Sequence, residues 1–134
     1  MVEIVCPPVD VEPTKIMGEA GGPQAKAYIT KFEGGRQAMR IYIDGGFDWK
    51  KSVAPMLPGC PDWCPATHFG YLEAGEMGIK MQDGTEKTIK AGETYMVPPG
   101  HLPIVTEKAV MVEFSQDTTY TNDKFIKGEK EEGK

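Results

Sequence analysis

The sequence has few cysteines and histidines, no long apolar run and no secretory signal. Three cysteines and two histidines occur in 134 residues, and three cysteines do not suit a disulfide framework. The apolar stretches are too short to cross a bilayer, and the N-terminus lacks the basic and apolar regions of a signal peptide. We therefore expect a cytoplasmic protein without a membrane partner, although a mature exported chain would have the same features.

Positive charge is also scarce. Lysine and arginine number 15 against 20 acidic residues, a formal net charge of −5. Nucleic acid binding needs clustered basic side chains, and no such block occurs. The composition therefore argues against nucleic acid as a partner.

Glycine and proline are plentiful, with 16 and 11 residues, and they are spread without a period. Apolar runs lie between them, which favours many short strands joined by tight turns and argues against a helical bundle. Asp83-Gly84 is a strong hairpin signal, and residues 47–53 can form one helical turn. The expected strands are 25–32, 37–43, 68–72, 76–81, 86–89, 95–97, 101–105 and 109–114.

The chain reads as one domain with two flanking segments. Residues 1–22 are expected to form an extended N-terminal arm, residues 23–118 a single β-barrel domain, and residues 119–134 a charged tail. The apolar residues Val2, Ile4 and Val5 would allow the arm to add a strand to the sheet of a second copy.

Two segments resemble the paired motifs of the cupin superfamily. The first runs from His68 to Gly75, and the second is Gly92-Glu-Thr-Tyr-Met-Val-Pro-Pro-Gly-His101. The resemblance covers about residues 57–116 and is closest to small single-domain, RmlC-like cupins of unassigned function. It implies an all-β fold, the double-stranded β-helix or jelly-roll barrel, and a homodimer.

The metal ligands of the family are replaced in this sequence. Alignment on Gly75 puts His68 at the position of the family's glutamate ligand, Cys64 at its second histidine and Asp62 at its first. The last family histidine falls on Pro103. His101 lies two residues earlier, and side chains two apart in a strand share a face.

The resulting candidate metal ligands are Cys60, Cys64, His68 and His101, with Asp62 in reserve. Because proline disfavours the helical conformation in the residue before it, the chain around these cysteines is expected to be extended. Thiolate and imidazole donors suit a tetrahedral Zn²⁺ site. Fe²⁺, Mn²⁺ and Ni²⁺ are the alternatives.

The function that follows is a small metal-binding cupin that binds an organic carboxylate or carbonyl compound in its barrel. An isomerase, a lyase or an oxygenase would fit, with Tyr71 or Tyr95 in proton transfer by analogy with other enzymes. The alternative is a non-catalytic binding or sensing module, with a closed structural metal site or with no metal. Glu73, Glu76 and Glu113 are further acid or base candidates, although carboxylates on such strands are mostly solvated.

Overall fold

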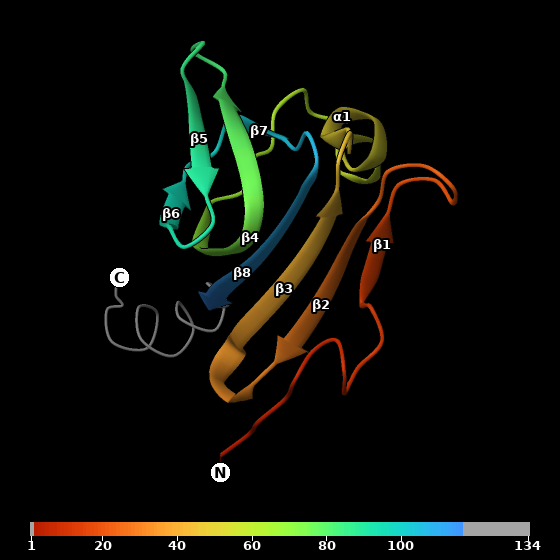
Figure 1. The fold of residues 1–134 in the computed structure, drawn as a ribbon, viewed down its shortest axis with the longest axis vertical. Coiled ribbons are helices and arrows are strands. Elements are labelled where there is room, and N and C mark those ends of the chain that lie inside the picture. Colours follow the sequence, from red (N-terminus) through yellow and green to blue (C-terminus); the bar gives the residue numbers. More distant parts are fainter. Residues whose placement is uncertain (1, 117–134) are drawn as a thin grey trace.

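A computed structural model describes residues 2–116 of the chain (Figure 1). The predicted charged tail, residues 119–134, lies outside the described residues. The elements are β1 (Lys15–Met17), β2 (Ala25–Lys31), η1 (Glu33–Gly35), β3 (Arg36–Asp44), α1 (Trp49–Ser52), η2 (Ala54–Met56), β4 (His68–Met81), β5 (Glu86–Lys90), β6 (Thr94–Val97), β7 (His101–Ile104) and β8 (Lys108–Gln116).

The strands form two antiparallel layers that share β4. One layer has the order β1-β2-β3-β8-β4, and β6 pairs with the first half of β4. The second half of β4 pairs with β5 and β7 instead. In Figure 1 the long strands β2, β3 and β8 run side by side, while β4 and β5 curve away from them at one end. The predicted all-β jelly roll is confirmed.

The strand β4 is continuous where the sequence predicts two separate strands, 68–72 and 76–81. A β-bulge between Leu72 and Ala74 and a positive φ of 81° at Gly75 bend it. The extra residue shifts the alternation of side chains, so that Leu72 before the bend and Met77 and Ile79 after it are all buried. One strand therefore contributes to the core on both sides of a sharp bend.

Alternating apolar residues line the inside of the longer layer. Ile41 and Ile43 on β3 are paired with Met111 and Ala109 on β8, and all four are buried. The helix α1 lies over one end of the barrel and places Trp49 inward. Its first turn is capped by the Asp48 side chain, which accepts a hydrogen bond from the backbone N–H of Lys51 at 3.2 Å.

The N-terminal segment runs beside the outer face of the longer layer. Lys15–Met17 forms the edge strand β1 inside the segment that is expected to be an extended arm. Farther toward the N-terminus, the Pro7 carbonyl accepts a hydrogen bond from Arg40, which also forms an ion pair with Glu73. Val2 is exposed.

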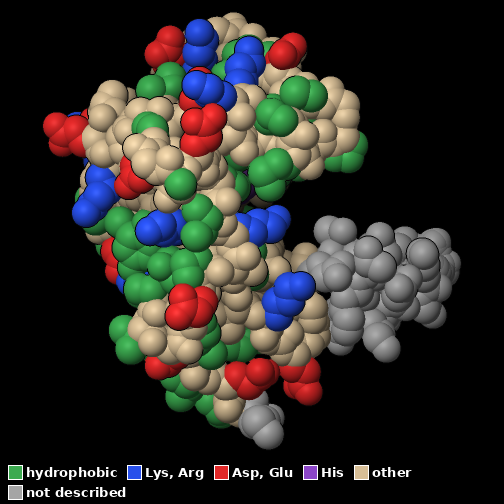
Figure 2. Space-filling view, turned by 90° about the vertical axis from the view of Figure 1, so that its right-hand side faces the viewer, with side chains coloured by type: hydrophobic (Ala, Val, Ile, Leu, Met, Phe, Trp, Pro, Cys, Tyr) green, Lys and Arg blue, Asp and Glu red, His purple; other side chains and the backbone are tan. Residues whose placement is uncertain are grey.

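The surface carries mixed charge. Figure 2 shows lysine, arginine and acidic side chains interspersed over one face of the molecule, with hydrophobic side chains gathered between them. None of the helices in residues 2–116 has the length and apolar character needed to span a membrane.

The bend at Gly75 predicts a large cost for adding a methyl group. A Cβ there would collide with the carbonyl oxygen of Lys108, and a positive φ disfavours an L residue by about 1–2 kcal/mol. We expect Gly75→Ala to lower the free energy of unfolding by about 3 kcal/mol, measured by urea denaturation.

Gly84→Ala is the matched control. Gly84 also has a positive φ, 95°, but nothing lies within 4 Å of a Cβ built there. Its expected loss is only about 1 kcal/mol. Equal losses of unfolding free energy in the two variants would show that the close approach at Gly75 does not matter for stability.

Candidate metal site

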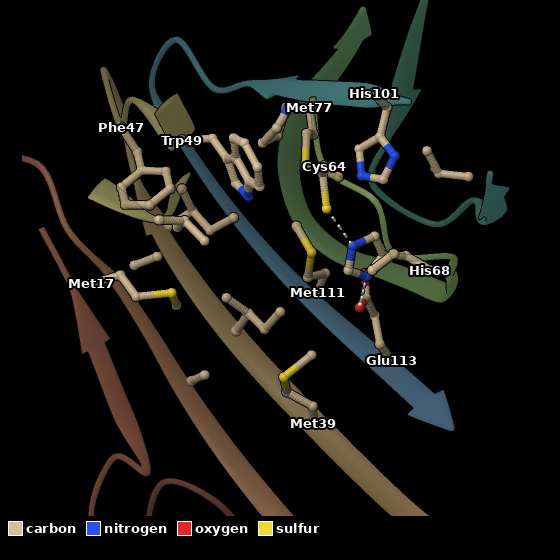
Figure 3. Close-up of a pocket in the computed structure, with 18 of the residues that line it drawn as sticks. Met17, Met39, Phe47, Trp49, Cys64, His68, Met77, His101, Met111 and Glu113 are labelled. Carbon is tan, nitrogen blue, oxygen red and sulfur yellow. Dashed lines mark hydrogen bonds and ion pairs between the residues drawn. The ribbon is translucent and has the colours of Figure 1, made fainter. Parts of the chain in front are cut away.

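Three side chains that could bind a metal meet at one end of the barrel. The thiol sulfur of Cys64 and one ring nitrogen each of His68 and His101 lie within 4.8 Å of one another. Cys64 and His101 are buried, and His68 is partly buried. Figure 3 shows the three side chains pointing toward one another. They are three of the four metal ligands that the sequence predicts.

Backbone pairing brings Cys64 next to His101. The two residues form an isolated antiparallel bridge, in which the Cys64 N–H donates to the His101 carbonyl at 2.8 Å. The Cys64 carbonyl accepts a hydrogen bond from the N–H of Gly100, also at 2.8 Å. Gly100 has a φ of 92°, a conformation suited to glycine that turns the chain into β7. The positions of the thiol and the imidazole are thus set by main-chain hydrogen bonds.

His68 is oriented by a buried carboxylate. Its Nδ1 lies 2.8 Å from Oε1 of Glu113, and Oε2 of Glu113 accepts a hydrogen bond from the Tyr95 hydroxyl at 2.7 Å. A carboxylate accepts hydrogen bonds, so Nδ1 carries the proton. The other nitrogen, Nε2, lies 3.6 Å from the sulfur of Cys64.

His101 is oriented by a backbone carbonyl. Its Nδ1 lies 2.7 Å from the Pro98 oxygen, and this acceptor keeps the proton on Nδ1. Nε2 is therefore the nitrogen of His101 that is left for the cluster. In both histidines Nδ1 is bonded to an acceptor and Nε2 is left for the cluster, which is the usual arrangement around metal-binding histidines.

The cluster strongly shifts two pKa values. Burial raises the pKa of the Cys64 thiol, but hydrogen bonds from His101, His68 and the Ala66 backbone outweigh burial and lower it to about 6. Burial lowers the pKa of His68, and hydrogen bonds to Cys64 and Glu113 outweigh that effect and raise it to about 10. At neutral pH the metal-free pair is therefore a thiolate facing an imidazolium.

Tyr95 stays protonated beside this pair. Burial and the negative charge of Glu113 both raise the pKa of its phenol, so the hydroxyl acts as a hydrogen-bond donor at neutral pH. This contact positions Glu113, and through Glu113 it positions His68.

Other predicted site residues lie away from the cluster. Cys60 is exposed and has a φ of 44°, because its N–H turns back to the Leu57 carbonyl at 3.1 Å. The extended conformation expected at Cys60 is therefore wrong. Asp62 is exposed, with Lys50 4.0 Å away, and Tyr71 is 42% exposed on the outer face of β4.

Glu113 has a central place that its sequence context does not predict. Carboxylates on such strands are expected to be mostly solvated, yet Glu113 is only 6% exposed. The signal lies in the alternation along β8, where Ala109 and Met111 are core residues. Glu113 is the next residue with the same parity and so faces the barrel interior.

The cluster opens onto a cavity of about 330 Å³ between the two layers. Most of its lining side chains are apolar, and they include Phe47, Trp49 and Met17, which lie across from the cluster, and Met39 (Figure 3). Pro103, which occupies the position of the last family histidine, also lines the cavity.

Sequence comparison finds no relative. No protein-family model matches the chain, and no curated protein matches it.

Structural comparison finds solved structures with a similar fold. A cupin-like protein from Thermotoga maritima has a TM-score of 0.53 at 11% identity, with 78% of each chain covered. The EutQ protein of Clostridium difficile has a TM-score of 0.53 at 14% identity, with 75% of each chain covered. An ectoine synthase from P. lautus has a TM-score of 0.52 at 14% identity, covering 69% of this chain and 63% of that enzyme. The chain therefore has the cupin fold.

The hydrogen bonds around Cys64 predict an unusually acidic thiol in the metal-free protein. After chelator treatment, and with Cys6 and Cys60 replaced by serine, we expect the ultraviolet absorbance of the Cys64 thiolate to appear with a midpoint near pH 6. The thiol loses its proton as the pH rises through this value, well below its ordinary value of 9.0.

His68→Gln should move this midpoint upward, because the imidazolium that stabilises the thiolate is lost. Cys64→Ser in the same background supplies the baseline, with no thiolate signal. A midpoint of 8 or higher with His68 intact would contradict the thiolate–imidazolium pair.

Proposed function

We propose that this chain is a metal-binding cupin that holds one Zn²⁺ through Cys64, His68 and His101 and binds an organic carboxylate or carbonyl compound in its barrel. The observation that carries the proposal is the meeting of these three donor atoms within 4.8 Å, with the second nitrogen of each histidine already bonded to an acceptor. Such a pre-oriented set is typical of metal centres.

The donor chemistry favours zinc. One thiolate and two imidazoles match the borderline-soft character of Zn²⁺, whereas Mn²⁺ prefers carboxylate and water oxygens. Three protein ligands leave a fourth position for water or substrate, as in catalytic zinc sites. Zinc does not change its oxidation state, so an isomerase or lyase fits better than an oxygenase.

The residues around the three ligands have separate tasks. Glu113 holds a proton of His68 on Nδ1, so that Nε2 would bind the ion after losing its own proton, and Tyr95 holds the second oxygen of Glu113. The apolar cavity wall limits the access of water to the site. When bound, the ion would supply Lewis-acid polarisation of a carbonyl or carboxylate oxygen.

A second candidate function is nucleophilic chemistry by Cys64 without a metal. The line Cys64–His68–Glu113 has the arrangement of a nucleophile, a base and an orienting carboxylate. The two candidate functions exclude each other at this site, because the atoms that would bind zinc are also the ones that would activate the thiol. Metal content therefore distinguishes them.

We also propose that the protein is a cytoplasmic homodimer. Four large apolar side chains lie exposed on the outer face of β4, β6 and β8, at 42–64% exposure, and they form a candidate interface: Phe69, Tyr71, Met96 and Phe114.

Sedimentation equilibrium should give a dimer for the wild type and a monomer for the Phe69→Ser, Phe114→Ser double variant. Ile104→Ser, an exposed site on β7, is the control, and an unchanged mass in the double variant would exclude this interface.

Zinc content tests the metal site. Elemental analysis and chelator competition should find about one zinc per chain in the wild type, and Cys64→Ser, His68→Ala or His101→Ala should each lose most of it. Cys60→Ser is the matched cysteine control and should keep full zinc content, because Cys60 lies outside the cluster. A wild type without stoichiometric zinc, whose Cys64 reacts with iodoacetamide, would favour the thiol candidate instead.

Loss of the hydrogen bonds behind His68 should weaken zinc binding less than loss of a ligand does. Glu113→Gln is expected to weaken zinc binding about 10–100-fold, since it removes the charged acceptor of His68. Tyr95→Phe should weaken zinc binding less, and Tyr71→Phe should leave it unchanged.

A further inference from the structure

The polar groups of the cavity are concentrated in the metal cluster and its hydrogen-bond partners. Apart from the exposed Lys15 and the indole N–H of Trp49, the polar side chains that line the cavity are Cys64, His68, Tyr95, His101 and Glu113. The last four are connected as described above, or bonded to the Pro98 carbonyl. The rest of the wall offers a ligand almost no hydrogen-bonding group.

The polar groups around the cluster are already engaged. Both oxygens of Glu113 accept hydrogen bonds, and Nδ1 of each histidine faces an acceptor. A hydroxyl group buried without a partner costs about 1–3 kcal/mol. A ligand with several hydroxyl groups, such as a sugar acid, would therefore lose several hydrogen bonds to water and gain few from the protein.

The apolar part of the cavity suits a hydrocarbon group. Met17, Met39, Met77 and Met111 line it together with aliphatic and aromatic side chains, and flexible methionines adapt to apolar groups of varied shape. In Figure 3 the Cys64–His68–His101 cluster lies toward one side, with Phe47, Trp49 and Met17 across from it. The volume of about 330 Å³ is at the small end of the range for ligand pockets.

We propose that the ligand is an apolar monocarboxylic acid or carbonyl compound, with its oxygen atoms at the Cys64–His68–His101 cluster and its hydrocarbon part against the methionine-lined wall. This inference rests on the proposed metal site, because the cluster would attract the head group through the bound ion. The apolar wall determines the chemical class of the rest of the ligand.

A series of carboxylates tests this class by calorimetry on the zinc-loaded protein. Each methylene from butanoate to octanoate should tighten binding about fourfold, as expected from about 0.8 kcal/mol per buried CH₂. Gluconate has the six carbons and the carboxylate of hexanoate but adds five hydroxyl groups, and it should bind at least about tenfold more weakly. No dependence on chain length, or gluconate binding as tightly as hexanoate, would overturn the inference and leave the zinc site standing.

Variants test the position of the hydrocarbon. Met39→Gln keeps the length of the side chain but adds a polar amide to the wall, and it should weaken octanoate at least about threefold without changing zinc content. Met56→Gln is the control, because Met56 is 61% exposed and lies outside the cavity lining. A thermal melt of each variant shows that it is folded. Equal octanoate affinity in both folded variants would contradict the placement.

Two further measurements test the position of the head group. Removing zinc should weaken octanoate at least about tenfold, while Lys15→Met should leave its affinity within about twofold. Loss of octanoate binding in Lys15→Met would reverse the proposed orientation. If the wild type takes up no zinc, the proposed function and the head-group assignment both fail, and the chain-length series on the metal-free protein then supports or overturns the apolar class by itself.

Discussion

The bend in β4 is the constraint on which the barrel and its site depend. Gly75 brings the backbone so close to the Lys108 carbonyl that no side chain fits, and the bulge before it changes the alternation of side chains. One strand can therefore pair with β8 and β6 in one layer and with β5 and β7 in the other. Without this bend, His68 at the start of β4 and the buried residues after Gly75 would not face the same interior.

The site combines a satisfied polar cluster with an apolar wall. Main-chain bonds place Cys64 beside His101, and Glu113 with Tyr95 orients His68. In each histidine Nδ1 is thus bonded to an acceptor and Nε2 is left for the cluster. Because the remaining wall is apolar, electrostatic interactions within the cluster are stronger than in water. The separation of the polar cluster from the apolar wall thus shifts the pKa values of Cys64 and His68, and it also limits the ligands that the cavity can accept.

Much of the fold was predictable because short-range patterns carry it. Alternating apolar residues predicted the strands that form β2 and β3, and the spacing of glycine and proline marked the turns. The two predicted strands on either side of Gly75 are one, because a β-bulge bends a strand without ending its hydrogen bonding. The edge strand β1 was missed since three residues, Lys15–Met17, carry too little pattern, and Cys60 departs from the extended conformation because a hydrogen bond to Leu57 turns the chain there.

The fold class, the place of both histidines in the two motifs and the lack of a clustered basic block can be read from the residues alone. These properties depend on composition and on the period of side chains along each strand. The folded chain is needed to see that Cys64 joins the histidines while Cys60 stays outside, that Glu113 lies behind His68, and that the cavity is largely apolar. The physical reason is that these relations join residues far apart in the chain, and strand register and backbone hydrogen bonds set them.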